Sequence, residues 1–175
     1  MTDSLRGKLL IASPSLYDYF RRAVVLVLEH NEEGAMGVVL NRPSETTVSD
    51  AIPDLAELAG DGELVLVGGP VSPESVIALG DFEDPSDAGT AVLGAVGLLD
   101  PDAPSPSLRR MRVYAGYAGW GPGQLDDELE QEAWIVEQAQ PDDPFHEGDL
   151  WPVALQRKGG GFSLLATMPS DPSLN

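Results

Sequence analysis

The sequence predicts a single α/β domain with α+β character, in which a layered mixed β-sheet has a central antiparallel hairpin covered by short helices. Two neighbouring apolar runs support this fold class, residues 23–29 (AVVLVLE) and 35–40 (AMGVVL). Both are rich in β-branched residues and nearly continuous rather than alternating, which is typical of strands buried on both faces. Only the short polar segment 30–34 joins them. We therefore expect an antiparallel hairpin in the middle of a sheet.

Length and composition set the class of protein. A chain of 175 residues, 42% of them hydrophobic, can form one core, so we expect one domain over residues 1–175. The absence of cysteine excludes a disulfide framework and a thiolate metal site. The longest apolar run, 23–28, is far shorter than the ~20 residues that span a bilayer, and the apolar segment 9–12 is too short for a signal peptide. We expect a cytoplasmic protein that is neither exported nor bound to a membrane.

The elements before residue 100 follow from periodicity and turn residues. A first strand is expected over 8–12, and a helix over 47–59 with Thr47 as its N-cap and Pro53 as a break. Further strands are expected over 63–67, 75–79 and 90–99. Gly68-Gly69-Pro70 and Ser72-Pro73 separate the first two of these strands.

The second half of the chain begins with a Pro-rich loop over 100–107 (DPDAPSPS), which holds no large apolar residue. Met111, Val113 and Ala115 alternate with more polar residues, which predicts a strand with one solvated face. A glycine-rich turn is expected over 116–123. A helix over 125–132, a strand over 134–139, a helix over 149–157 and a final strand over 162–166 complete the prediction.

The charge of the chain is strongly negative, with a formal value of −19. Residues 46–108 hold twelve acids and no base, and residues 126–149 hold ten acids and no base. Such runs are usually solvated faces. Ten basic residues against 29 acids give little to neutralise phosphates, so we do not expect direct binding of nucleic acid.

Four stretches resemble one family of bacterial proteins. They are LLIASPSLYDYFRRAVVLVLEHNEEGAMGVVLNRP at 9–43, GGPV at 68–71, GYAGWGPGQLDDELEQEAW at 116–134 and LLATMP at 164–169. Together they are similar to the AlgH/YqgE family. The resemblance implies a compact bacterial cytoplasmic domain of layered α/β build. It supplies no mechanism, although some members carry a transcriptional-regulator label. Where many relatives have a Leu-His pair, this chain has Leu79-Gly80, so a role for that histidine does not carry over.

One candidate binding surface combines Arg42, Tyr117 and Trp120, supported by Asn41. The glycines of 116–123 would keep the two aromatic rings from being buried by their neighbours, and a cation among many acids could mark a site for an anion or an acidic partner. The structural alternatives are a core position for Trp120 and an ion pair for Arg42. A phosphate cradle at 116–123 is disfavoured, because acids fill the first turn of the next helix.

His30 is a further candidate, as a proton shuttle or a ligand-binding residue. The only other histidine is His146, so a zinc site is not expected, and a histidine satisfied by local hydrogen bonds is favoured. His30 closes the first strand of the hairpin and Asn41-Arg42 closes the second. Because the two strands run in opposite directions, we expect these residues at opposite ends of the ladder. A Ser13 or Ser15 nucleophile lacks the G-x-S-x-G context, and no cofactor fingerprint is present.

Three classes of function remain from the sequence. The favoured one is a non-enzymatic binding or scaffolding domain, with a protein or a small anionic ligand as its partner and a regulatory role open. The alternative is a hydrolase that uses carboxylates and a divalent metal. A DNA-binding regulator ranks last, because neither acidic helical segment contains a basic residue to act in a recognition helix.

Overall fold

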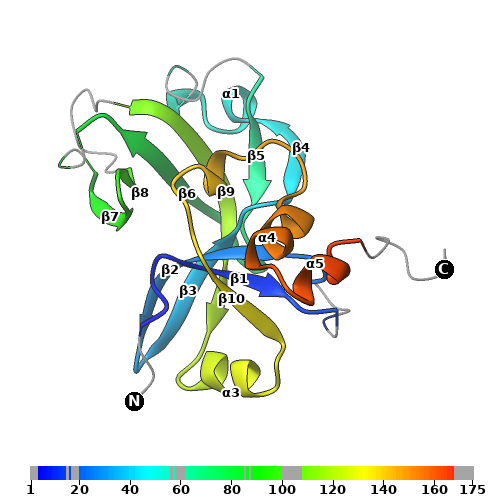
Figure 1. The fold of residues 1–175 in the computed structure, drawn as a ribbon. Coiled ribbons are helices and arrows are strands. Elements are labelled where there is room, and N and C mark those ends of the chain that lie inside the picture. Colours follow the sequence, from blue (N-terminus) through cyan, green and yellow to red (C-terminus); the bar gives the residue numbers. More distant parts are fainter. Residues whose placement is uncertain are drawn as a thin grey trace.

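The computed structural model describes residues 4–14, 16, 20–55, 57, 62–84, 86, 88–99 and 108–167. The Pro-rich loop expected over 100–107 lies outside these residues. The described chain forms a ten-stranded mixed β-sheet with short helices packed against it (Figure 1). This is the α+β architecture that the sequence predicts. Among the described residues, no helix is long and apolar enough to cross a membrane.

The ten strands have the following bounds: β1 (Lys8–Ala12), β2 (Val24–Asn31), β3 (Gly34–Val39), β4 (Pro43–Thr47), β5 (Leu64–Val67), β6 (Val71–Phe82), β7 (Thr90–Leu93), β8 (Val96–Leu98), β9 (Leu108–Trp120) and β10 (Trp134–Gln138). The α-helices are α1 (Val48–Ala51), α3 (Gln124–Glu130), α4 (Leu150–Lys158) and α5 (Phe162–Leu165), and the 3-10 helices are η1 (Pro53–Leu55) and η3 (Asp143–Phe145). The strand order is β10-β1-β2-β3-β9-β6-β8-β7, and β4 pairs with β5 off this path.

The predicted hairpin is confirmed as β2 and β3, which pair antiparallel from Asn31 opposite Gly34 to Val25 opposite Val39. The side chains of 23–28 are buried on both faces of the sheet. Alternate residues enter two separate clusters: Leu26 packs in the cluster under α4, and Val25 packs in the cluster near α3. The continuous apolar pattern of this segment therefore reflects a strand between two layers.

Strand β9 is shared by both halves of the molecule. Its last residues, Ala118 to Trp120, pair with β3, and its earlier residues Tyr114 and Ala115 pair in parallel with β5. Along its other edge β9 pairs antiparallel with β6 over most of its length. Strands β3 and β5 thus occupy successive parts of one edge of β9, and the sheet divides between them. We call this point the fork.

Gly68 sits at the fork and connects the diverging strands. Its N–H donates to the carbonyl of Ala115 on β9 at 2.9 Å, and its carbonyl accepts from the N–H of Val39 at 2.8 Å. The next residue, Gly69, lies so close to β9 that a Cβ atom there would come within 2.1 Å of the carbonyl carbon of Tyr117. The reciprocal position, Gly116, has φ +76° and would place a Cβ 2.6 Å from the carbonyl oxygen of Gly69. Only glycine allows two backbones to approach this closely.

Two predicted boundaries are wrong because turn residues were assigned to the wrong element. Ser72-Pro73 does not separate two strands: it lies within β6, where the register shifts between Val71 and Val76, and a proline is tolerated at such a bulge. The single strand expected over 90–99 is a hairpin of β7 and β8, because Gly94 (φ +57°) turns the chain.

Two further expectations are wrong for tertiary reasons. The glycine-rich segment is not a turn from residue 116, since β9 continues to Trp120 and the turn begins at Gly121. The final segment expected as a strand is the helix α5. Its Phe162, Leu165 and Ala166 are partly buried against the main core, and their spacing of three and four residues places them on one face of a helix.

The glycine contact at the fork gives a first prediction. Gly69→Ala should lower the free energy of unfolding by about 3 kcal/mol or more, because the added methyl meets fixed backbone atoms of β9 rather than a movable side chain. Urea unfolding measures the change. Gly121→Ala is the matched control, since a Cβ there would meet only the end of Gln124 at 3.9 Å, and it should shift stability by less than about 1 kcal/mol. Equal effects of the two substitutions would contradict the prediction.

Candidate functional site

The main candidate site is a pocket of about 470 Å³ beside the fork. It lies between the chain leaving β3, the strand β5, strand β9 and the segment that precedes α4. The residues lining it are Leu40, Asn41, Pro43, Gly62, Glu63, Leu64, Leu66, Arg112, His146, Glu147, Gly148 and Asp149. This volume falls in the range typical of small-ligand and side-chain pockets.

Arg112 forms one polar end of the pocket. Its Nη1 donates to Oε2 of Glu63 at 3.3 Å, and its Nη2 donates to Oε1 of Glu147 at 2.8 Å and to the carbonyl of Phe145 at 3.3 Å. The guanidinium is 14% exposed, whereas the Glu147 side chain is 88% exposed. Arg112 therefore bridges two acids from distant parts of the chain.

Asn41 forms the other polar end. Its Oδ1 accepts from the N–H of Val24 at 3.1 Å, and its Nδ2 donates to the carbonyl of Arg22 at 2.9 Å and to Oδ1 of Asp149 at 3.0 Å. The same Asp149 oxygen accepts from the N–H of Trp151, which makes Asp149 the N-cap of α4. Asn41 thus joins the end of β3 to the start of α4.

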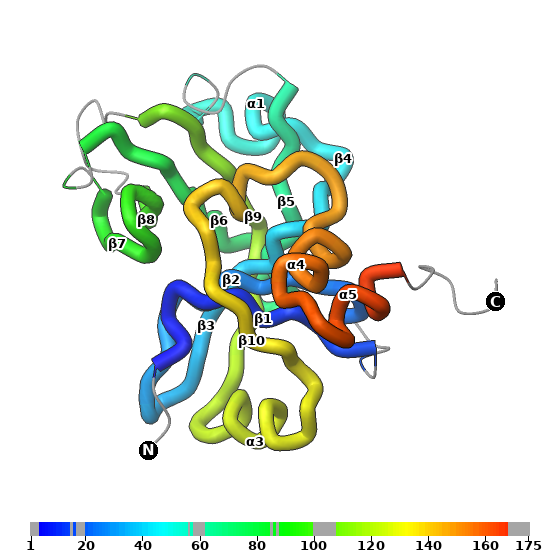
Figure 2. The backbone as a smooth tube through the Cα atoms, viewed as in Figure 1, coloured from blue at the N-terminus to red at the C-terminus, as the bar shows by residue number. Residues whose placement is uncertain are grey.

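The wall that carries Glu147 belongs to residues 139–149, which we call the crossing segment. It runs from β10 across β9 to α4 (Figure 2). A bidentate ion pair fixes it: Arg157 donates to both oxygens of the buried Asp143 at 2.8 and 2.6 Å, and this hydrogen bond raises the pKa of Arg157. The Arg110 guanidinium stacks 4.3 Å from the centre of the Phe145 ring. The wall is therefore preformed.

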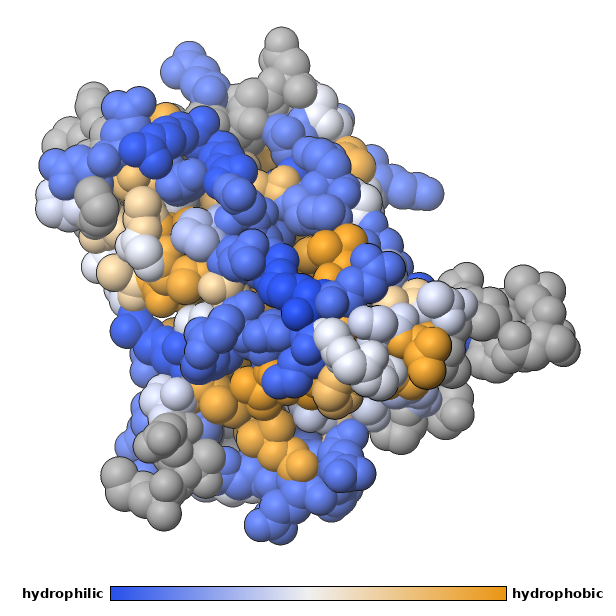
Figure 3. Space-filling view, in the orientation of Figure 1, coloured by the Kyte–Doolittle hydropathy of each residue, from blue (hydrophilic) through white to orange (hydrophobic). Residues whose placement is uncertain are grey.

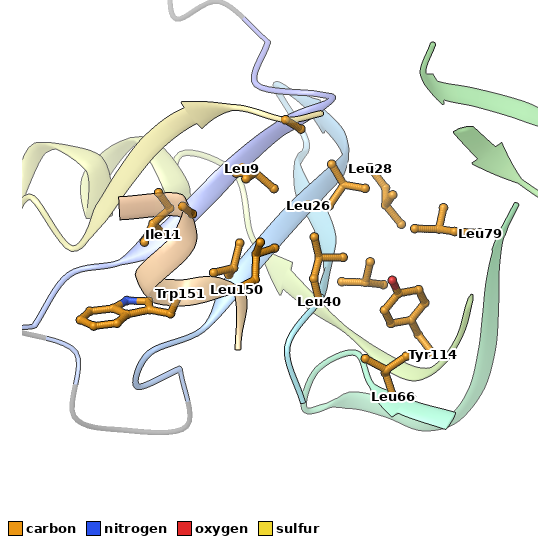
Figure 4. Packing of buried hydrophobic residues seen from close by; sticks show 14 of the residues in the cluster. Leu9, Ile11, Leu26, Leu28, Leu40, Leu66, Leu79, Tyr114, Leu150 and Trp151 are labelled. Atoms are coloured by element: carbon orange, nitrogen blue, oxygen red, sulfur yellow. The ribbon is translucent and has the colours of Figure 1, made fainter. Parts of the chain in front are cut away.

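The floor of the pocket is apolar and continuous with the main core. Leu40 and Leu66 line the pocket and also belong to the cluster around Tyr114 and Leu150 (Figure 4). The Tyr114 hydroxyl is buried there with no hydrogen-bond partner among the described residues, and burial raises its pKa. In the space-filling view, an apolar spot lies among hydrophilic side chains where β5 approaches α4 (Figure 3). The site therefore combines an apolar floor with charged residues around it.

The structure does not bring the five sequence-predicted site residues together. Asn41 lines the main pocket, and His30 lines a separate cavity of about 230 Å³ at the opposite end of the hairpin, as its position in the ladder predicts. Tyr117 is partly buried against the main core, whereas Trp120 belongs to the cluster on the other face of the sheet. Tyr117 and Trp120 therefore face opposite sides of the sheet.

The expectation that glycines keep Trp120 accessible is wrong, because its side chain is only 6% exposed. The ring lies 6.0 Å from that of Trp134 and 6.4 Å from that of Phe20. The indole N–H groups of Trp120 and Trp134 both donate to Oε1 of Glu128, at 3.1 and 2.9 Å. The Trp120 ring of this motif therefore belongs to the core.

The ring nitrogens of His30 have polar neighbours, as expected for a histidine with a structural role. Its Nδ1 accepts the N–H of Leu5 at 2.9 Å, and its Nε2 lies 4.0 Å from Oδ1 of Asp126. With Nδ1 accepting this hydrogen bond, Nε2 is the ring nitrogen that faces Asp126. Among the described residues, no three His, Cys, Asp or Glu side chains are placed to hold a metal ion.

Arg42 is partly buried at the end of β3, where its Nη2 donates to the carbonyl of Arg21 at 2.9 Å. It is not among the residues that line the main pocket. Its role in binding a ligand stays a prediction, while the hydrogen bond to Arg21 shows a structural contribution.

Sequence reasoning missed most of the main pocket, namely Glu63, Arg112, His146, Glu147 and Asp149. The one usable signal was the group Arg109, Arg110 and Arg112 within an acidic chain, which indicates ion pairs. Arg109 and Arg110 pair with Asp81, whereas Arg112 faces the pocket. The choice of acid partners depends on the pairing of β9 with other strands, which local patterns do not reveal.

The fold and the pocket define a class of protein: an α+β domain on a forked mixed sheet, with one preformed polar pocket beside the fork. The model of the AlgH-like family (DUF179) matches residues 9–163. The chain belongs to this family.

Curated relatives and solved structures agree with this assignment. A UPF0301 protein of Streptomyces coelicolor is 47% identical, over 98% of this chain and 96% of the relative, and one of Mycobacteroides abscessus is 40% identical, over 97% and 87%. A crystal structure from Corynebacterium diphtheriae is similar with a TM-score of 0.86 at 29% identity, covering 95% of this chain and 94% of that one. The solution structure of AlgH from Pseudomonas aeruginosa is similar with a TM-score of 0.71 at 30% identity, covering 97% and 98%.

The aromatic cluster gives a second prediction. Trp120→Ala should lower the free energy of unfolding by about 3 to 5 kcal/mol, because it removes a buried ring and leaves a cavity beside Trp134 and Phe20. Trp120→Phe keeps an aromatic ring and removes the bond to Glu128, so it should cost clearly less than the alanine variant. Chemical denaturation followed by circular dichroism separates the two. A loss of less than about 1 kcal/mol for Trp120→Ala would contradict a core role.

Proposed function

We propose that this chain is a non-catalytic binding domain whose ligand occupies the main pocket beside the fork. The observation that carries the proposal is the pocket itself: about 470 Å³ of space with an apolar floor and polar groups at both ends. Polar groups around an apolar pocket give orientation and specificity to a bound group. The side chains that form the two ends are held by hydrogen bonds, so the site needs little rearrangement to bind.

The composition of the pocket supports binding rather than catalysis. Its lining residues include no serine, threonine, cysteine, lysine or tyrosine, so the nucleophilic side chains that remain are carboxylates and His146. Its acids are engaged in structural contacts: Glu63 and Glu147 bind Arg112, and Asp149 caps α4. Carboxylates used in this way are poorly suited to acid–base work. A scaffolding or regulatory role in the cytoplasm would follow from what the pocket binds.

The binding proposal has a test in living cells. A photo-crosslinking amino acid placed at the exposed, pocket-lining position His146 should give a discrete covalent adduct to a cellular partner. The same amino acid at Glu130, which is exposed on α3 and outside the pocket, is the matched control and should not give that adduct. Adding Leu64→Trp to fill the pocket should remove the adduct from position 146. Absence of an adduct, or the same adduct from both positions, would contradict the proposal.

Direct recognition of duplex DNA is not part of the proposed function, whatever label other family members carry. Among the described arginines, Arg110, Arg112 and Arg157 are already paired with acids. Few cations are then left to displace the counterions of the duplex. An electrophoretic shift assay at about 150 mM salt should show no specific complex. Submicromolar affinity with a steep dependence on salt would show this expectation to be wrong.

A further inference from the structure

The charges around the main pocket are unbalanced. Three carboxylates line it, those of Glu63, Glu147 and Asp149, against one guanidinium, that of Arg112. A second guanidinium, that of Arg22, is not among the lining residues but lies 3.5 Å from Oδ2 of Asp149, so the excess negative charge rests on Glu63 and Glu147. The side chains of Arg112 and Arg22 are 14% and 21% exposed, whereas those of Glu63, Asp149 and Glu147 are 35%, 48% and 88% exposed. The positive charge of the site therefore lies inward and the negative charge faces solvent. An entering group meets carboxylates first.

The carboxylates also keep capacity to bind a further donor. Arg112 takes one oxygen from each acid, Oε2 of Glu63 and Oε1 of Glu147. Within the described part of the chain, no hydrogen bond reaches the second oxygen of either acid. A carboxylate can accept several hydrogen bonds at once, and those from a charged donor are the strongest. Arg112, in contrast, already donates to three oxygen atoms, so an anion would have to displace an acid.

The floor of the pocket suits an aliphatic chain. Leu40 and Leu66 are buried, and Leu64 and Pro43 are accessible at the edge of the pocket. Lysine and arginine side chains bury their methylene groups along apolar surface while the charged end stays with polar groups. The methylene groups of such a side chain would pack on the leucines. Its charged end would lie between the carboxylates of Glu63 and Glu147.

We propose that the pocket takes an arginine or lysine side chain from a basic segment of a protein partner. The proposal rests on the proposed function, because it names the occupant of the same pocket. It replaces the small anionic ligand considered from the sequence, since that ligand would meet three carboxylates and one engaged cation.

A protein is favoured over a free small cation because the negative surface continues beyond the pocket. Asp142 on the crossing segment is 83% exposed although Arg110 binds its Oδ1, so its Oδ2 faces a partner together with Glu147 of the same segment. A basic segment can meet these acids together with the pocket, whereas a single small cation meets the pocket alone. The net charge of −19 also attracts basic partners over distances of about a Debye length.

The test uses defined peptides and the whole isotope-labelled protein. A blocked peptide Gly-Gly-Arg-Gly-Gly should shift the NMR signals of residues 62–66 and 146–149, with a dissociation constant of about 1 mM. The same peptide with neutral citrulline, which keeps the shape but not the charge, should bind at least about 5-fold more weakly. A peptide with three arginines should bind about 10-fold more tightly than the single-arginine peptide, and more weakly as salt rises.

Matched variants separate the pocket from the general charge of the protein. Glu147→Gln removes one exposed carboxylate at the pocket and should lower the affinity for the arginine peptide by about 3-fold or more. Glu130→Gln removes one exposed carboxylate on α3 and should leave the affinity within about 1.5-fold. Both side chains are exposed, so both variants should remain folded, which their thermal unfolding checks.

Several outcomes would overturn the proposal. They are equal binding of the citrulline peptide, equal effects of the two variants, shifts that map outside the pocket, or no binding at about 10 mM peptide. If the three-arginine peptide binds no better than arginine methyl amide, the occupant is a small cation and the proposed protein partner is wrong. If the peptides do not bind while the covalent adduct from position 146 still forms, the proposed binding function stands. Only the proposal that a basic side chain occupies the pocket is then wrong.

Discussion

The close backbone contact between Gly68-Gly69 and strand β9 is the constraint on which the rest of the structure depends. It places β5 beside β9 where β3 departs, with hydrogen bonds from Gly68 to both neighbours. A side chain at Gly69 or Gly116 would hold the two backbones apart. Without that approach the two halves of the sheet could not share β9, and β4, β5 and α1 would lose their support. The glycines of both family-like motifs therefore meet in space and serve the fold.

The pocket is a consequence of the same fork. When β3 and β5 separate, the space between them is left with an apolar floor of Leu40 and Leu66. The crossing segment then closes one side, held at Asp143 by Arg157 and at Phe145 by Arg110. Polar residues gather there because they lie at strand ends and in connections, where side chains from separate elements converge. A pocket thus arises where the sheet cannot stay continuous.

The sequence was most informative where the physical cause is local. Periodicity identified β1, the β2–β3 hairpin and β10, and capping preferences identified Thr47 as an N-cap. It failed where a residue with a strong local preference serves a tertiary contact. Gly116 and Gly119 suggested a turn, yet both lie in β9, where the backbone of Gly69 packs on Gly116. Of the expected site residues only Asn41 lines the main pocket, because the others were grouped by chemical type rather than by the faces they occupy.

By itself the sequence determined the family, the fold class, the excess of negative charge and the elements whose signals span a few residues. Only the tertiary structure decided which acids neutralise which arginines and where a pocket opens. Arg112 shows the reason: its two acid partners lie 49 residues before it and 35 residues after it. Nothing in its neighbourhood along the chain distinguishes these acids from the other carboxylates. They are selected by the register of β9 and by the path of the crossing segment, and both depend on many contacts formed at once.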